Sequence, residues 1–303
     1  MTKASSKYIV VAISDRSRGM MMKYQTLPKA LYAYPGVEKI LHDNQSCILF
    51  KKLSRSLLHQ EKIATSHCFI YVLEGEVGVQ ASDGSSIMTR PGEMLFMPRD
   101  TYLISDFVTV DDTIELYLIF IEHDIIDVFL NAKVKCKDIA SPIIPSICKL
   151  QANASISHYF KALTNVYSDL DNNRELLKLK ILEFLYLVDI DSRNDITETL
   201  EISEQRKRKR NMTSLMLENY KNNLTVSDFA NLSGRSLSTF NREFKRKYGK
   251  PPKQWLIEQK MFEANKLLAN GSNVTNCALE VGYSNVSHFI KAYRSIHGKT
   301  PKE

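Results

Sequence analysis

The first half of the chain alternates short apolar runs with turn-forming residues. Four such runs, each four or five residues long, occupy residues 69–73, 77–81, 94–97 and 117–121. Between them stand segments such as Arg90-Pro91-Gly92-Glu93, which supply the preset or positive φ angles that tight turns require. Short strands at this spacing favour an antiparallel β-sandwich or small barrel. We therefore expect a β-rich domain over residues 1–150.

A helical period replaces the strand pattern between residues 155 and 190. Residues 176–187 are apolar on more faces than a surface helix needs. Two explanations stay open at this point. The helix packs on its own β-domain, or part of it forms a subunit interface, since an exposed apolar stripe is costly in a monomer.

Residues 191–210 are polar, lack a clear period and end in the basic run 206–210. Such a composition is typical of a linker, so we expect a hinge here between two domains. A basic run of this length is usually a solvated segment. Beside a nucleic-acid-binding domain it would add nonspecific phosphate contacts.

Residues 211–303 contain an internal repeat. The pattern Val-x-x-x-Ala-x-x-x-Gly that begins at Val226 returns 48 residues later at Val274, and beyond the glycine the offset becomes 49. Each copy predicts a helix, a short turn and a second helix, with Gly234 or Gly282 in the turn. We expect Ser236 and Ser284 to cap the second helices.

The second helix of each copy has one apolar and one polar face. The inward positions are Leu237, Phe240, Phe244 and Tyr248 in the first copy, and Phe289, Tyr293 and Ile296 in the second. The outward side chains can bond base edges or phosphates in a major groove, and Ile290 suits a thymine methyl group. They are Ser238, Asn241, Arg242 and Lys245, then Asn285, Ser287, Ile290, Lys291 and Arg294.

The segment between the copies predicts a stiff helical spacer. It opens at Pro251-Pro252, runs through Ala269 and ends at Gly271. Some eighteen residues span about 27 Å, and successive major grooves lie roughly 34 Å apart. One chain could therefore seat two recognition helices in neighbouring grooves. A generic helical bundle, the alternative, would leave the paired glycines and polar faces as coincidence.

Charge is divided unevenly along the chain. Residues 206–303 hold 19 Lys and Arg against 7 Asp and Glu, whereas residues 1–205 hold 22 against 27. Concentrated positive charge indicates a polyanionic partner, and nucleic acid comes first because neutralising phosphates releases counterions. On charge alone, an ordinary basic domain stays open as the alternative.

The second copy reads Ala278-Leu279-Glu280-Val281-Gly282-Tyr283-Ser284, then Phe289, Tyr293-Arg294 and Gly298-Lys299-Thr300-Pro301. In this pattern residues 210–303 resemble the DNA-binding domain of the AraC/XylS family of transcription regulators. The resemblance implies base-reading positions at Ser238, Asn241 and Arg242, and at Val286, Ser287, Ile290 and Lys291. Val286 and Ile290 depart from the usual polar residues, which implies less complete hydrogen-bonded reading by the second helix.

The β-rich half is similar, through residues 71–76 and 91–96, to the cupin-like amino-terminal domains of that family. These sense effectors or form dimers. Residues 179–187 are similar to the dimerisation helix of activators of type III secretion genes, some of which a partner protein controls. The resemblance implies promoter DNA, RNA polymerase and a second copy as partners, and activation as the mode. The implied dimer positions are Leu179, Leu182, Leu185 and Tyr186.

Other classes of protein find little support. No window approaches the roughly 18 apolar residues of a membrane span, and the five cysteines form no Cys-x-x-Cys pair. Metal-dependent cupins use a His-x-His pair, which the chain lacks. We expect a cytoplasmic protein with no catalytic residues, metal or cofactor.

Together these patterns predict an α+β protein. A cupin-like antiparallel β-sandwich or barrel occupies residues 1–150, and a helical dimerisation segment residues 151–190. A linker covers residues 191–210, and an all-α domain with two helix-turn-helix units residues 211–303. We expect a sequence-specific transcription regulator modulated by a small ligand. Control by a partner protein, or a cupin enzyme fused to a DNA-binding module, are the alternatives.

Overall fold

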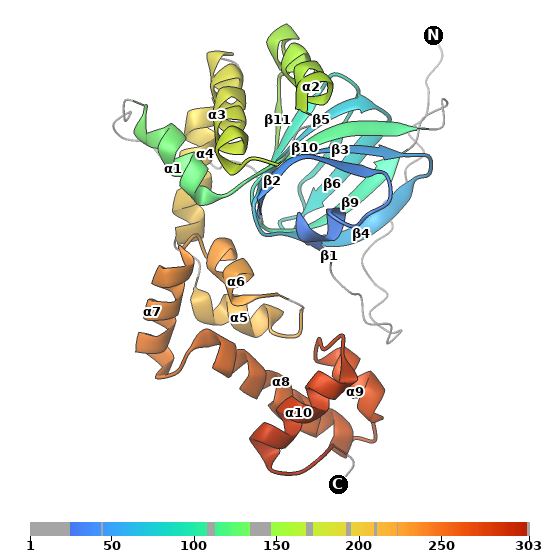
Figure 1. Ribbon diagram of the computed structural model, residues 1–303, viewed down its shortest axis with the longest axis vertical. Helices are drawn as coiled ribbons and strands as arrows, with labels where there is room; N and C mark the ends of the chain where they lie inside the picture. The colour runs from blue at the N-terminus through green and yellow to red at the C-terminus, as the bar shows by residue number, and fades with distance from the viewer. Residues whose placement is uncertain are drawn as a thin grey trace.

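The computed structural model describes most of the chain. The described residues are 25–43, 45–107, 113–133, 147–167, 172–191, 195–208, 211–222 and 224–301. Figure 1 shows a β-rich domain flanked by helices, with a second, helical domain below it.

Two facing sheets confirm the predicted β-sandwich. One sheet has the order β1-β4-β9-β6-β7, with bounds Gln25–Leu27, Leu57–Ala64, Thr101–Phe107, Glu76–Ala81 and Ser86–Thr89. The other has the order β11-β8-β5-β10-β3-β2, with bounds Cys148–Leu150, Met94–Met97, His67–Glu74, Ile114–Ile121, Ser46–Leu53 and Val37–Asp43. All pairings are antiparallel except β1 with β4, and a short 3-10 helix, η1 (Lys29–Leu31), follows β1.

The central strands are buried on both faces. Successive side chains of a strand point to opposite sides of its sheet. Phe69 and Tyr71 of β5 therefore join the core under the flanking helices, whereas Ile70 and Val72 join the core between the sheets. Because both faces are covered, this strand reads as one continuous apolar run instead of an alternation.

Helices α2 (Ala154–Tyr167) and α3 (Arg174–Ile190) cover the outer face of the six-stranded sheet, and α1 (His123–Asn131) packs against α3. Aromatic rings join α2 and α3 to the strands. Phe160 of α2 stacks on Tyr71 and Tyr117, with ring centroids 4.9 and 4.6 Å apart. Phe184 of α3 meets Phe69 edge-on at 5.1 Å. Most of the apolar surface of α3 thus packs on its own domain.

The structure differs from the predicted linker over residues 191–210. Residues Ile196–Arg208 form helix α4, whose Ile196 and Leu200 are buried in the same core as α3. Thr197 Oγ1 donates a hydrogen bond of 2.8 Å to Asp189 of α3. The helix is mostly polar, and its buried residues include Thr199 and Ser203, so its sequence shows no clear apolar period. Of the basic run, residues 206–208 end α4, and residues 209–210 lie outside the described residues.

The carboxy-terminal domain confirms two helix-turn-helix units. Its helices are α5 (Met212–Asn219), α6 (Val226–Leu232), α7 (Leu237–Tyr248), α8 (Pro252–Ala269), α9 (Val274–Glu280) and α10 (Val286–His297). Each unit has its own core, and α8 contributes Trp255 and Leu256 to the first and Met261 and Ala264 to the second. One 18-residue helix therefore fixes the two units relative to each other.

Candidate nucleic-acid interface

The first unit, α6 and α7, is built as its sequence predicts. Gly234 has φ +71° in the turn, and Ser236 Oγ accepts a hydrogen bond from the Thr239 amide at 3.2 Å. Helix α6 starts with a reciprocal capping box between Thr225 and Asp228. These caps satisfy amide groups that a helix start leaves without partners.

The second unit, α9 and α10, differs from the prediction at its cap. Asn285, not Ser284, caps α10, with Oδ1 accepting from the His288 amide at 3.1 Å. The inserted residue in the second turn moves the helix start by one position. The 49-residue offset that follows the insertion indeed pairs Asn285 with Ser236, the cap of α7.

The outward faces of the recognition helices α7 and α10 are largely exposed. On α7, Ser238, Arg242 and Lys245 are exposed, while Asn241 is half-buried and donates through Nδ2 to the Leu237 carbonyl at 2.9 Å. The exposed predicted positions on α10 are Asn285, Ser287, Lys291 and Arg294.

Four positions do not follow the predicted division of each recognition helix into a buried apolar face and an exposed polar face. Val286 and Ile290 of α10 are half-buried against the core of the second unit. Leu237 and Ile296, expected to face inward, are 46% and 42% exposed. Leu237 precedes the buried stripe in the first turn of α7, and Ile296 follows it in the last turn of α10, where the core no longer reaches.

Among the described residues, the cations of the outward faces take part in no ion pair. Other cations of this domain are held in ion pairs, as Arg235 is by Glu243 at 2.8 Å. Within the described part of the chain, no ion pair engages the outward cations Arg242, Lys245, Lys291 and Arg294. Unpaired cations at equivalent places on two helices suit a polyanion.

A groove with a volume of about 660 Å³ lies between the two units. Burial lowers the pKa of the Lys260 amine, on α8 in this groove, to about 8. The sequence of the spacer identifies its apolar residues, but it does not show which of its lysines face the groove. The lining includes Thr225, Val226, Ser227, Leu237, Asn241, Lys253, Lys260, Tyr283, Asn285 and His288.

Comparisons with known proteins cover both domains. Residues 67–198 match the family described as the ExsA N-terminal regulatory domain, and residues 229–303 match a helix-turn-helix domain family. The HTH-type transcriptional regulator ExsA of Pseudomonas aeruginosa is 27% identical over 240 residues, which cover 77% of this chain and 84% of that protein. The virulence regulon transcriptional activator VirF of Yersinia enterocolitica is 25% identical over 239 residues, covering 77% and 86%.

The chain therefore carries an AraC-type helix-turn-helix domain behind an ExsA-type regulatory domain, the domain pair of a transcription regulator. Its amino-terminal domain is the ExsA type of regulatory domain, and its carboxy-terminal domain is the DNA-binding domain. Among solved structures, ToxT from Vibrio cholerae with an unsaturated fatty acid bound is similar with a TM-score of 0.40 and 10% identity, covering 86% of this chain and 95% of that one.

The positions on α3 that were predicted to dimerise this regulator divide into two groups. Leu179 and Tyr186 are 64% and 39% exposed, and Leu182 is half-buried. The prediction is wrong for Leu185, which is fully buried because it lies on the face of α3 that covers the sandwich. Ile190, which the sequence reasoning omitted, is 76% exposed one turn beyond Tyr186. The period of the helix could have identified it.

Side chains of the described residues pack closely inside the regulator's sandwich. Lys51 and Asp106 form a buried ion pair of 2.6 Å between the sheets. Burial, with the nearby charge of Lys51, lowers the pKa of Lys62 to about 8. The cavity beside these residues measures about 20 Å³, room for about one water molecule. Sequence reasoning missed these buried charges because each stands in an otherwise ordinary strand.

Two features are absent from the described residues. None of their helices combines the length and hydropathy that crossing a bilayer demands. No group of three or more His, Cys, Asp and Glu side chains among them is arranged to hold a metal ion.

Proposed function

We propose that this regulator activates transcription by seating α7 and α10 in successive major grooves of promoter DNA and by contacting RNA polymerase. The observation that carries the proposal is the pair of exposed cationic faces on two matching helices, joined by the 18-residue helix α8. The proposal places the protein in the cytoplasm and gives it no enzymatic activity. VirF, similar over both domains, is by name an activator of a virulence regulon; we assign this chain the same role.

The two recognition helices contribute unequally to base recognition. In α7, Arg242 is free to form a bidentate contact with guanine, and Ser238 lies on the same exposed face. In α10, the half-buried Ile290 offers a methyl group to thymine instead of a hydrogen bond. Lys245, Lys291 and Arg294 serve phosphates, so Lys291 is not given the base contact that the family resemblance implies. The groove lysines Lys253 and Lys260 face the backbone that crosses between the grooves.

A paired substitution tests this division. Arg242→Ala is expected to weaken promoter binding by about 1–3 kcal/mol and to relax specificity at one base pair. Lys291→Ala, at the equivalent place in α10, is expected to weaken binding to all duplexes alike. It should also reduce the slope of log affinity against log salt concentration by about 1. Titration of promoter and scrambled duplexes at several salt concentrations measures both effects, with Arg55→Ala as the surface control. If Arg242→Ala lost the same affinity for the promoter and the scrambled duplex, base reading by Arg242 would be refuted.

The amino-terminal domain supplies dimerisation through the exposed stripe Leu179, Tyr186 and Ile190 of α3, bordered by Leu182. The stripe is apolar, solvent-exposed and supported from beneath by the sandwich core, as a helix-to-helix interface requires. Ile190→Asp is expected to shift the protein from dimer to monomer in sedimentation velocity. Val166→Asp, at an exposed apolar position on α2, is the matched control. A dimer that survives Ile190→Asp together with Leu179→Asp would exclude α3.

Control by a partner protein is favoured over a small ligand by the sandwich interior. Small-molecule sites commonly measure about 300–1,000 Å³, and the cavity that described residues line between the sheets measures about 20 Å³. Exposed Val128 on α1 extends the apolar surface next to α3. Thermal shift with candidate effectors tests the alternative: a ligand that stabilises the amino-terminal domain would restore the small-molecule hypothesis.

A further inference from the structure

Lys260 brings an amine into the groove between the two helix-turn-helix units. It lies in the middle of α8, and its side chain is half-buried. Its Nζ stands 5.5 Å from the centre of the Tyr283 ring in a cation–π contact. A Cβ atom added at Gly282 would lie 3.0 Å from the same Nζ. The amine is therefore held against the turn of the second unit, at one place in the groove.

The described residues place no acidic side chain in the groove beside this amine. None of those that line the groove is aspartate or glutamate. Glu263, nearly one turn further along α8, is the ion-pair partner of Lys221 at 2.7 Å. Lys250 is likewise paired, with Glu258 at 2.6 Å. Lys260 therefore differs from these lysines in keeping an uncompensated charge.

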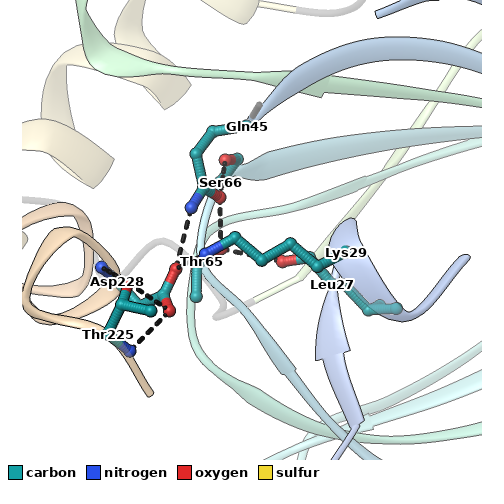
Figure 2. A network of polar contacts seen from close by, with 7 residues as sticks. All are labelled: Leu27, Lys29, Gln45, Thr65, Ser66, Thr225 and Asp228. Carbon is teal, nitrogen blue, oxygen red and sulfur yellow. Dashed lines mark hydrogen bonds and ion pairs between the residues drawn. The ribbon is translucent and has the colours of Figure 1, made fainter. Parts of the chain in front are cut away.

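Asp228 borders the groove but does not compensate its charge. It follows residues 225–227, which belong to the lining, and is 1% exposed. Its Oδ1 accepts hydrogen bonds from Lys29 Nζ and Gln45 Nε2, both at 2.8 Å, and its Oδ2 accepts two from Thr225 (Figure 2). This carboxylate is thus neutralised by a lysine of its own, and the groove stays positive.

A second cation suits the groove to a phosphate group. Lys253 stands seven residues before Lys260, so two turns of α8 place both on one face, about 10.5 Å apart along the axis. Leu256 and Ile257, between them in the sequence, add apolar surface to the lining. With about 660 Å³, the groove falls in the size range of small-molecule sites. Two cations beside an apolar wall fit a small organic phosphate.

Burial makes the Lys260 amine a nucleophile at neutral pH. It lowers the pKa of this amine to about 8. At pH 7 about one amine in ten is then neutral, against about one in 2,500 for an ordinary lysine. The neutral form carries the reactive electron pair, so a lysine in an apolar pocket near another cation is activated. The other titratable side chains of the described lining are Lys253, Tyr283 and His288, none of which is a carboxylate that would favour the charged amine.

We propose that Lys260 is an acylation site, which takes the acyl group of an acyl phosphate whose phosphate binds at Lys253. This inference rests on the proposed DNA-binding function. The neutral amine attacks the carbonyl carbon, so that a C–N bond forms while the bond from this carbon to the phosphate oxygen breaks. Phosphate leaves with that electron pair and takes up the proton released by the nitrogen. The products are acyl-lysine and inorganic phosphate.

Acylation would weaken the binding of DNA. It removes the charge of Lys260 and its cation–π contact with Tyr283, and leaves a neutral amide in a groove that we assign to the DNA backbone. One of the two groove cations would then no longer attract a phosphate of the duplex. The regulator would thus release its promoter where acyl phosphate accumulates.

The first test treats the full-length protein with acetyl phosphate and measures the acetylated fraction of each lysine by peptide mass spectrometry. We expect Lys260 to react at least about tenfold faster than Lys161, an exposed lysine on α2. Lys62 is the matched control, because burial, with the nearby charge of Lys51, lowers its pKa to about 8 as well. It is 4% exposed beside a cavity of about 20 Å³, so it should stay unmodified. Similar rates at Lys260 and Lys161, or at Lys260 and Lys62, would overturn the inference.

A second donor tests the role of the phosphate. The uncharged ester p-nitrophenyl acetate delivers the same acetyl group without a phosphate. Lys253→Ala should lower the ratio of the Lys260 acetylation rates with acetyl phosphate and with this ester about threefold or more. An unchanged ratio would show that Lys253 does not bind the donor, and would exclude the proposed class of donor.

Promoter titration connects the modification to DNA binding. The acetylated wild type should bind about tenfold more weakly, whereas Lys260→Arg, carried through the same treatment, should keep its affinity. Equal affinity before and after acetylation, or an equal loss in Lys260→Arg, would refute the effect. Should Lys260→Arg not fold, protection decides: bound promoter should slow acetylation of Lys260 but not of Lys161. A wild type that binds promoter and scrambled duplexes equally, with Lys260 still acetylated, would refute the proposed function instead.

Discussion

The two helix-turn-helix units share a backbone but differ in what they present. Their turns hold glycines with φ +71° and +77°, and their recognition helices end at glycines with φ +71° and +73°. The outward face of α7 nevertheless carries Asn241 and Arg242 where α10 carries Ile290 and Lys291. The scaffold of a duplicated unit is set by its glycines and core, so its outward positions were free to diverge. We infer that the first unit supplies most of the specificity.

The largest loss of stability should come from a substitution of the glycine in the turn of the second unit. A Cβ atom added at Gly282 would lie 2.4 Å from the Lys221 carbonyl oxygen, which belongs to the loop before α6. Gly282→Ala would therefore push the two units apart as well as strain a positive φ. We expect a loss of about 3 kcal/mol or more in the free energy of unfolding, measured by denaturant titration.

Gly298→Ala is the matched control for this effect. Gly298 has a similar φ of +73°, and a Cβ there would meet no atom within 4 Å. Its replacement should cost only the strain of a left-handed residue, about 1–2 kcal/mol. Equal destabilisation by the two alanines would show that the turn of the second unit is not braced by the first.

Prediction from sequence succeeded where a local rule governs the structure. The repeat located both units, the spacer and the cap Ser236, because helix starts and glycine turns depend on neighbouring residues. The 49-residue offset of the repeat also leads from Ser236 to Asn285, the cap of α10. The prediction of Ser284 follows from the preference of serine for cap positions and not from this offset. Short apolar runs separated by turns were likewise enough to predict the β-sandwich.

Prediction failed where contacts are distant along the chain. Leu185 and Leu179 look alike in sequence, and only the placement of α3 on the sheet buries one and exposes the other. Helix α4 buries the polar Thr199 and Ser203 beside Ile196 and Leu200, so apolar periodicity could not reveal it. The contact of Asp228 with Lys29 spans 199 positions and shows no pattern at all in the sequence.

The groove between the units provides a pH-dependent test of their joint binding. The buried Lys260 amine has a pKa of about 8, below its ordinary value, because burial disfavours its charge. A phosphate beside it would raise that pKa, so DNA binding would take up a proton above pH 8. We expect affinity to be level below pH 8 and to fall by about tenfold by pH 9.5, measured by titration in matched buffers.

Lys260→Arg is the control, since arginine keeps its charge across this range. It should retain affinity near pH 9.5 and remove most of the decline. A decline that persists unchanged in Lys260→Arg would assign the pH dependence to other groups. The groove would then be a space between two reading helices and not a third contact with the DNA backbone.

The smallest predicted effects compare the caps of the two recognition helices. Ser236 and Asn285 each accept a hydrogen bond from an amide in the first turn of their helix. Replacing either with alanine should lower the free energy of unfolding by about 1 kcal/mol. Ser284→Ala should change it by no more than a few tenths, because Ser284 stands one residue before the cap. If Ser284→Ala were instead the costly change in α10, the helix would begin one residue earlier than its cap Asn285 indicates. The outward face would stay the same, because Phe289 and Tyr293 fix it by packing in the core of the second unit. The cap therefore decides where the second recognition helix begins, and the core decides which of its side chains meet the DNA.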